Sequence, residues 1–343
     1  MWTNMDSLTQ IVLGAACGEA VLGKKIGNKA LLFGALGGTI PDLDVFVGKW
    51  LFSNEIQSMA FHRGLMHSIP FALMASVALG YLLFWSYNRG HRFGTTTRKD
   101  WITLFFWSIF THPILDSFTA YGTQLFAPFS NYRVAFNNIA VADPLYTVPF
   151  LLCLIVLMFF RRTSKWRRFV LKFGLVVSSS YMIFTVFNKV YVDSIFKSSL
   201  ETNAIEYSRF RSQPTILNNI LWYGVAESDS SYYIALYSIF DQKSTPKKWQ
   251  RIPKNHDILP AEDKDIKTLI WFSDGFYSVS KAEEGAFIFK DLRYPLMDEN
   301  DPNSSVFSFS IRKENERWIA APFYPENPSE KDLTNFWNRL KGI

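Results

Sequence analysis

Long apolar runs fill the first 190 residues of the chain and do not recur after that point. A helix that crosses a bilayer needs roughly 20 mostly apolar residues, because the hydrocarbon core is about 30 Å thick. We therefore expect residues 1–190 to form a mainly α polytopic membrane bundle of about five or six transmembrane or membrane-embedded helices. The more polar residues 191–343 are expected to form a separate soluble α+β domain. The predicted helices are 6–22, 30–47, 66–87, 101–120, 141–160 and 169–190.

Charge is divided unevenly between these two parts. The first 190 residues hold 17 Lys and Arg against 8 Asp and Glu, a net charge of +9, and the remainder holds 19 against 22, a net charge of −3. The basic residues cluster in alternate loops, at 24–29, 89–99 and 161–168. The positive-inside rule places such loops in the cytoplasm. The high pI thus reflects membrane topology, and no nucleic-acid partner is implied.

Three short polar motifs lie at the ends of the apolar runs: Pro41 to Asp44, His62 to Ser68 and His112 to Asp116. Ionisable side chains are costly at membrane depth unless they are paired or bind a metal. All three motifs fall on the side opposite the basic loops, so the predicted topology brings them to the extracytoplasmic face. The chain after the sixth helix emerges on that face too, and we expect the C-terminal domain to be extracytoplasmic.

Each motif alone permits a second interpretation. Asp42 and Asp44 can both point at one ion, or they can be exposed loop residues. His62 and His67 are five apart, so they need a bend, which Gly64 permits, and otherwise they are interfacial histidines. His112 and Asp116 lie on one helical face around Pro113, which should kink or restart the helix, and their alternative is a structural His–Asp hydrogen bond.

Together, the motifs supply the donors of a metal site, with six candidate ligands: Asp42, Asp44, His62, His67, His112 and Asp116. Imidazole and carboxylate suit zinc, which we favour, or manganese or iron, as one ion or two. Such an ion lowers the pKa of a bound water, and two ions would clamp both oxygens of a phosphoester. Arg63 could bind an anionic substrate oxygen, and Ser68 could contact a ligand or substrate or simply begin a helix.

Other polar residues of the apolar half have open roles. Asp143 opens the fifth helix, where it could be a metal ligand, an acceptor that hydrogen-bonds a ligand, or simply an N-cap. Glu19 lies inside an apolar run and could hold a proton or pair with a basic residue. Cys17 and Cys153 offer neither a disulfide framework nor a thiolate zinc motif. No cleavable signal peptide is expected.

The ordered motifs Met5–Gly14, Ile40–Asp44, Phe61–Ser68 and His112–Asp116 resemble the YdjM-like inner-membrane metal-dependent hydrolases over about residues 5–160. The resemblance implies a multi-pass inner-membrane protein with a metal-dependent hydrolase site. It maps the family's aspartate and histidine pattern onto the six candidate ligands above. Many members carry a histidine where this chain has Gln10, and glutamine coordinates a metal only weakly through its carbonyl. A metal held by that histidine elsewhere would be absent here, or a water would take the place of the ligand.

The leading hypothesis is a membrane-bound hydrolase in which metal-activated water attacks an ester or phosphoester at the outer face. A site at the bilayer interface would suit a lipid-linked or other small substrate, with membrane lipids as partners. One alternative is an ion-binding transporter, whose ligands should be spread through the bilayer depth. The other is a non-catalytic scaffold with a closed metal site. The sequence leaves the oligomeric state open.

Within the C-terminal domain, aromatic and β-branched residues predict strands, and Ser329 to Asp332 resembles a capping box that opens a final helix. The predicted strands are Ser231–Phe240, Thr268–Phe272, Phe276–Val279, Ala286–Phe289 and Val306–Ile311.

Overall fold

The computed structural model describes residues 7–282, 285–296, 305, 307–314, 317–323 and 329–343. Residue 6 of the first predicted helix and Val306 of the last predicted strand lie outside these ranges. The chain divides into two compact units. A helical unit contains residues 1–47 and 61–186, and a second unit contains residues 48–60 and 187–343.

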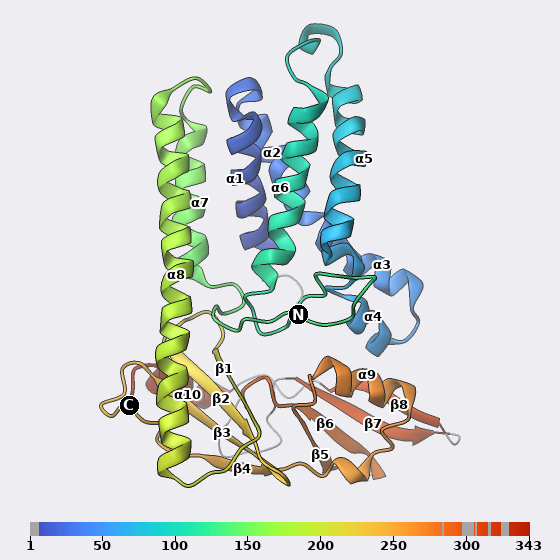
Figure 1. Ribbon diagram of the computed structural model, residues 1–343, viewed down its shortest axis with the longest axis vertical. Helices are drawn as coiled ribbons and strands as arrows, with labels where there is room; N and C mark the ends of the chain where they lie inside the picture. The colour runs from blue at the N-terminus through green and yellow to red at the C-terminus, as the bar shows by residue number, and fades with distance from the viewer. Residues whose placement is uncertain (1–6, 283–284, 297–304, 306, 315–316, 324–328) are drawn as a thin grey trace. The chain divides into compact units, whose positions relative to one another are not determined.

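Helices of the first unit run alongside one another (Figure 1). They are α1 (Ser7–Ile26), α2 (Asn28–Thr39), α5 (Ile69–Tyr87), α6 (Arg98–Asp116), α7 (Pro144–Met158) and the first part of α8 (Lys165–Thr202). Among the described residues, α5 and α8 are long and apolar enough to cross a membrane. A third candidate arises if α2 and the segment Pro41–Leu51 form one span with a 43° bend.

The bend at Pro41 corrects the prediction of a continuous helix over 30–47. Proline has no N–H to donate, so the α-helical ladder stops at Thr39 and a 3₁₀ turn (η2, Pro41–Leu43) leads into α3 (Asp44–Leu51). The predicted helix at 66–87 likewise begins only at Ile69, after a 3₁₀ turn (η3, Leu65–His67). Both turns carry residues of the polar motifs. In contrast, α6 passes through Pro113 without ending.

Glycines allow α1 and α2 to pack with their backbones in close contact. A Cβ on Gly14 would overlap the carbonyl oxygen of Gly34, and one on Gly18 would overlap that of Ala30. A Cβ on Gly38 would meet the backbone of Gln10. Small residues spaced four apart are the usual means of such close approach between membrane helices. The contact places the start of α1 beside the end of α2, where the first polar motif begins.

The second unit contains two four-stranded antiparallel sheets in meander order. The first is built from β1 (Arg209–Pro214), β2 (Leu221–Glu227), β3 (Ser231–Ser238) and β4 (Gln250–Pro253). The second is built from β5 (Tyr277–Lys281), β6 (Phe287–Asp291), β7 (Ser308–Glu314) and β8 (Arg317–Phe323). The capping box at Ser329 is present and opens α10 (Glu330–Leu340).

The strand predicted at Thr268–Phe272 is wrong, because this segment ends a helix, α9 (Lys264–Phe272). Asp263 caps the helix by accepting from the backbone N–H of Asp265. Ile266, Leu269 and Phe272 recur every three residues and are buried on one face. The apolar residues that suggested a strand are instead the buried face of this helix.

An early segment of the chain completes the second unit. The short helix α4 (Glu55–Phe61) places the fully buried Ile56 in a core cluster with Leu269 and Phe289. Asn54 donates a hydrogen bond to Asp265 over 2.7 Å. The second unit thus includes residues 48–60, which separate two of the polar motifs in the sequence.

Candidate metal centre

The three polar motifs meet at one end of the helical unit. Ligand atoms of Asp42, His67 and His112 all lie within 4.8 Å of one another, so this buried group could hold a metal ion. The two Nε2 atoms are 3.1 Å apart, and Asp42 Oδ1 lies 3.5 Å from that of His67 and 3.4 Å from that of His112. The side chains of His67 and His112 are at most 1% exposed, whereas that of Asp42 is 22% exposed. The centre is therefore open to its surroundings on the Asp42 side.

Polar oxygen atoms lie on the far side of each ring, beside Nδ1. His112 Nδ1 lies 2.6 Å from the carbonyl oxygen of Gly38. A carbonyl oxygen only accepts, so the proton of this ring is on Nδ1 and the lone pair of the neutral ring is on Nε2. His67 Nδ1 lies 3.0 Å from Asp44 Oδ2, which favours the same tautomer. With both rings neutral, as metal binding requires, two nitrogen lone pairs would face one another inside the unit.

Asp116, the last residue of α6, lies beside the same two histidine rings. Its Oδ2 lies 3.4 Å from His67 Nε2 and 3.5 Å from His112 Nε2. The other oxygen accepts a hydrogen bond from Gln10 Nε2 over 2.7 Å. Arg63 Nε lies 3.2 Å from Oδ2 and supplies a positive charge beside it.

Asp44 and His62 lie on the Nδ1 side of His67, away from the two Nε2 atoms. Asp44 Oδ1 contacts His62 Nδ1 at 2.8 Å, and Oδ2 accepts from the backbone N–H of Arg63 at 2.9 Å while facing His67 Nδ1. Burial lowers the pKa of His62 although Asp44 opposes this, which favours the neutral ring. A carboxylate placed on Nδ1 of a metal-binding histidine is the usual arrangement that orients such a ring.

Arg63 lies at the edge of the centre, 3.2 Å from Asp116. It is buried and adopts a left-handed backbone with φ of +59°, a conformation that is rare in non-glycine residues and clusters at functional sites. Its Nη1 donates to Thr119 Oγ1 over 2.8 Å, and its guanidinium carbon is 5.0 Å from the centre of the Tyr121 ring. Arg133 lies 4.8 Å from the same ring.

Ser68 acts as a helix N-cap, accepting from the backbone N–H of Phe71 at 3.2 Å, which is the second of the roles considered for it. Sequence reasoning missed the Gly38 carbonyl, Thr119 and Tyr121. A backbone carbonyl leaves no signal in the residue types. Thr119 and Tyr121 follow Asp116 closely in the chain, and this short distance in sequence is the signal that could have indicated them.

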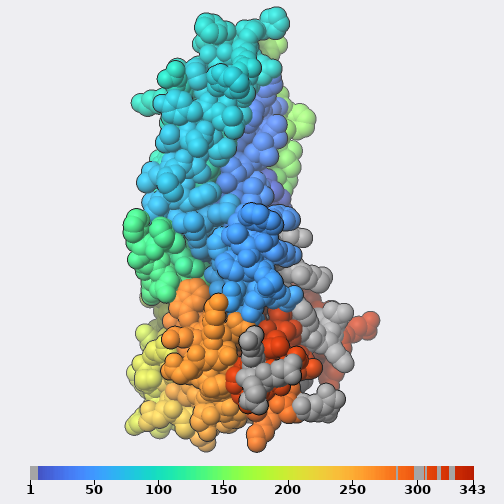
Figure 2. Space-filling view, turned by 90° about the vertical axis from the view of Figure 1, so that its right-hand side faces the viewer, coloured from blue at the N-terminus to red at the C-terminus, as the bar shows by residue number. Residues whose placement is uncertain are grey.

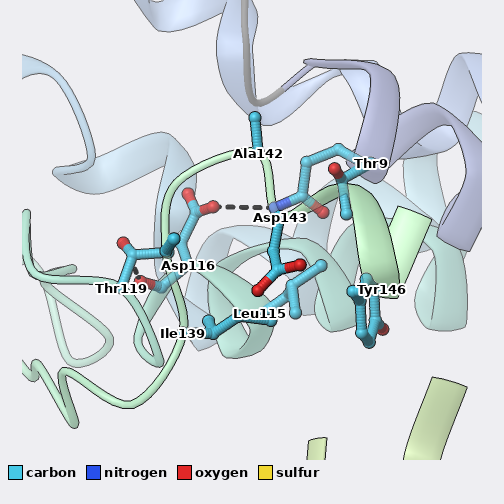
Figure 3. A pocket seen from close by; sticks show the side chains of 10 residues that line it. Thr9, Leu115, Asp116, Thr119, Ile139, Ala142, Asp143 and Tyr146 are labelled. Atoms are coloured by element: carbon cyan, nitrogen blue, oxygen red, sulfur yellow. Dashed lines mark hydrogen bonds between the residues drawn. The ribbon is translucent and has the colours of Figure 1, made fainter. Parts of the chain in front are cut away.

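A small pocket adjoins the centre at Asp116. Gln10, Asp116, Thr119, Asp143 and Tyr146 are among its lining residues, and its volume is about 20 Å³. Figure 3 shows the side chains of Asp116 and Asp143 in this pocket, coming from the end of α6 and from the loop before α7. Asp143 also caps α7 through Leu145 N–H, and burial raises the pKa of its carboxyl group.

Other polar residues singled out by type are not part of the group of Asp42, His67 and His112. Glu19 forms a bidentate pair with Arg167, with both N–O distances 2.6 Å, so it pairs with a basic residue. Arg167 is therefore buried rather than part of an exposed basic loop. His91 is exposed, and His256 stacks on Tyr277 at 3.8 Å in the second unit.

Comparison with known proteins agrees with the resemblance of the motifs. The model of the family described as YdjM inner membrane protein matches residues 5–192. An uncharacterized protein of Bacillus subtilis strain 168, YfhP, is 32% identical over 150 residues, which cover 41% of this chain and 42% of the relative. This match thus spans about two-fifths of that relative's length. No solved structure matches the chain. Because the family model covers more than half of the sequence and all three polar motifs, the chain belongs to the YdjM inner membrane protein family.

Proposed function

We propose that this protein is a membrane-bound metal-dependent hydrolase that acts on an ester or phosphoester. His67, His112, Asp42 and Asp116 would hold a divalent cation, with zinc favoured and manganese or iron also compatible with the donors. The observation that carries the proposal is the pair of Nε2 atoms 3.1 Å apart, with carboxylate oxygens 3.4–3.5 Å from them.

The donor set fits a cation because its buried atoms otherwise repel one another. With Nδ1 of His112 bonded to a carbonyl, lone pairs and carboxylate oxygens converge on one point. Burying such groups without a compensating charge costs several kcal/mol. Two histidines and carboxylates are donors typical of catalytic zinc, which activates water for attack near neutral pH.

The chain's own residues would orient the centre and the substrate. Asp44 and the Gly38 carbonyl hold the two rings with Nε2 inward. Arg63 would neutralise a substrate oxygen, since its guanidinium is fixed by Thr119 and Tyr121 beside Asp116. Substrate would approach from the Asp42 side, where the centre is least buried.

We further propose a lipid-linked or other amphiphilic phosphoester as substrate, taken at the outer membrane face. The loop between α6 and α7 carries exposed aromatic side chains, of which Phe129 is 85% and Tyr132 is 66% exposed. This loop forms a bulge on the surface, green in Figure 2. Aromatic residues at the ends of apolar helices are typical of the membrane–water interface. Arg63 and Arg133, both over Tyr121, add positive charge for an anionic headgroup.

The test is a pair of substitutions in the centre, His67→Ala and Asp116→Asn. We expect the purified wild-type protein to contain zinc and to hydrolyse at least one member of a phosphoester panel that includes lipid-linked substrates. Each variant should lose zinc and at least 100-fold of this activity, because each removes a donor. His91→Ala, which changes an exposed histidine, is the matched control and should retain both.

Full activity in both centre variants would contradict the proposal. A transporter would instead carry the metal into sealed vesicles, and such uptake would favour the alternative function. The clustering of the donors at one end of α2, α5 and α6, rather than along their length, argues against a transport path.

A further inference from the structure

The pocket beside the centre contains a glutamine oxygen whose direction is set by its own amide nitrogen. Gln10 Nε2 donates to Asp116 Oδ1 at 2.7 Å and lies 3.3 Å from the carbonyl oxygen of His112. Both neighbours are acceptors, so exchanging the amide nitrogen and oxygen would place oxygen against oxygen. Gln10 Oε1 therefore points away from Asp116 Oδ1 and from the carbonyl oxygen of His112. It has no hydrogen-bond partner among the described residues, although the side chain is only 2% exposed.

Asp143 brings a buried carboxylate to the same pocket. It is 2% exposed, and it accepts from Leu145 N–H at 2.9 Å and from the Tyr181 hydroxyl at 2.8 Å. No cationic side chain of the described part of the chain forms an ion pair with it. A buried carboxylate without a positive partner is costly, even when it accepts hydrogen bonds.

We propose that this pocket is a second cation site, for a hard divalent ion of the Mg²⁺ or Mn²⁺ class. Gln10 Oε1 and the Asp143 carboxylate would bind the ion, and Asp116 would be shared with the histidine centre. The donors are all oxygen, which selects hard cations, whereas the first centre has two imidazoles. The pocket volume of about 20 Å³ has room for one ion or one water.

Charge balance agrees with a second cation. The two sites contain four aspartates, Asp42, Asp44, Asp116 and Asp143. We count against them one divalent ion and the guanidinium of Arg63, which is ion-paired with Asp116. This leaves one negative charge among buried groups. A second divalent ion reverses it to one positive charge, which an anionic oxygen of the substrate would neutralise. The inference rests on the proposed function for the shared role of Asp116, and it narrows the substrate class to phosphoesters, which two ions clamp well.

The experiment uses the full-length protein loaded with zinc, to which Mn²⁺ is added and followed by electron paramagnetic resonance. Zinc binds nitrogen donors more tightly than manganese, so it should retain the histidine centre. We expect one zinc and one further manganese per chain. Replacing zinc by paramagnetic Co²⁺ should broaden the manganese signal, since ions that share a carboxylate lie about 4 Å apart.

Two variants locate the manganese. Gln10→Leu and Asp143→Asn should each weaken manganese binding by at least tenfold. Asp143→Asn should keep zinc at one per chain, because the hydrogen bonds of Asp143 go to Leu145 and Tyr181 and not to a zinc ligand. Gln10→Leu also removes a hydrogen bond to Asp116, so its zinc affinity should fall as well. Asp229→Asn, which changes an exposed carboxylate, is the control and should bind both ions as the wild type does.

The two readouts separate the two proposals. A wild-type protein that binds no zinc, manganese or iron at the histidine centre would contradict the proposed function. Zinc-loaded protein that binds no manganese, or that binds it equally well in both variants, would overturn the second site and leave a water molecule in the pocket.

Discussion

At the scale of single residues, two aspartates two positions apart face different atoms of the histidine rings. Asp42 presents Oδ1 to both Nε2 atoms, whereas Asp44 lies on the Nδ1 side of His67. The sequence predicts the residue types of the centre but not this division. The choice depends on which ring atom faces which carboxylate, and that follows from the turns at Pro41 and Gly64 rather than from spacing.

This division predicts unequal effects of two equivalent substitutions. Asp44→Asn should lower zinc affinity by about 10–100-fold, because the ring of His67 loses its charged partner but all direct donors remain. Asp42→Asn should cost more, because it weakens a direct donor. Competition with a chromophoric chelator measures both affinities. Equal losses would contradict the assignment of Asp44 as a residue that positions the ring.

At the scale of elements, the glycine contact between α1 and α2 brings Gln10 close to the first polar motif. Gly34→Ala should force the two helices apart, because the new Cβ would overlap the backbone of Gly14 and Gly18. We expect a loss of about 1–3 kcal/mol in the free energy of unfolding, typical of overpacking, together with weaker zinc binding.

Leu36→Ala, an exposed position on the same helix, is the control for this substitution and should leave zinc affinity unchanged. Thermal unfolding and zinc titration of both variants provide the comparison. A Gly34→Ala protein with wild-type zinc affinity would show that the close contact does not set the geometry of the centre.

Element types were predictable where one strong signal dominated. The apolar runs indicated the helices, and the capping box at Ser329 indicated α10. The interruption at Pro41 was underestimated, since a proline can also lie inside a membrane helix, as Pro113 does in α6. The α9 error arose because a short buried helical stripe and a strand have similar compositions. β1, β2, β4 and β8 were not predicted, because pairing with neighbouring strands decides such segments.

At the scale of the whole molecule, residues 48–60 belong to the unit that otherwise begins at 187. Ile56→Ala should therefore destabilise the C-terminal unit by about 2–5 kcal/mol, since it leaves a cavity in the cluster around Leu269. Hydrogen exchange of α9 and β6 would report the change. The neighbouring Gln57→Ala is the control, and equal exchange in the two variants would contradict the assigned packing.

This shared unit also limits how often the chain crosses the bilayer. Residues 48–60 and 187–343 fold together, so they must be on the same side, and the stretch between them has to make an even number of passes. If α5 and the first part of α8 each cross the membrane once, then α6 and α7 either both cross it or both do not. The requirement for an even number of crossings thus links the topology of α6 to that of α7, which the composition of these two helices does not determine.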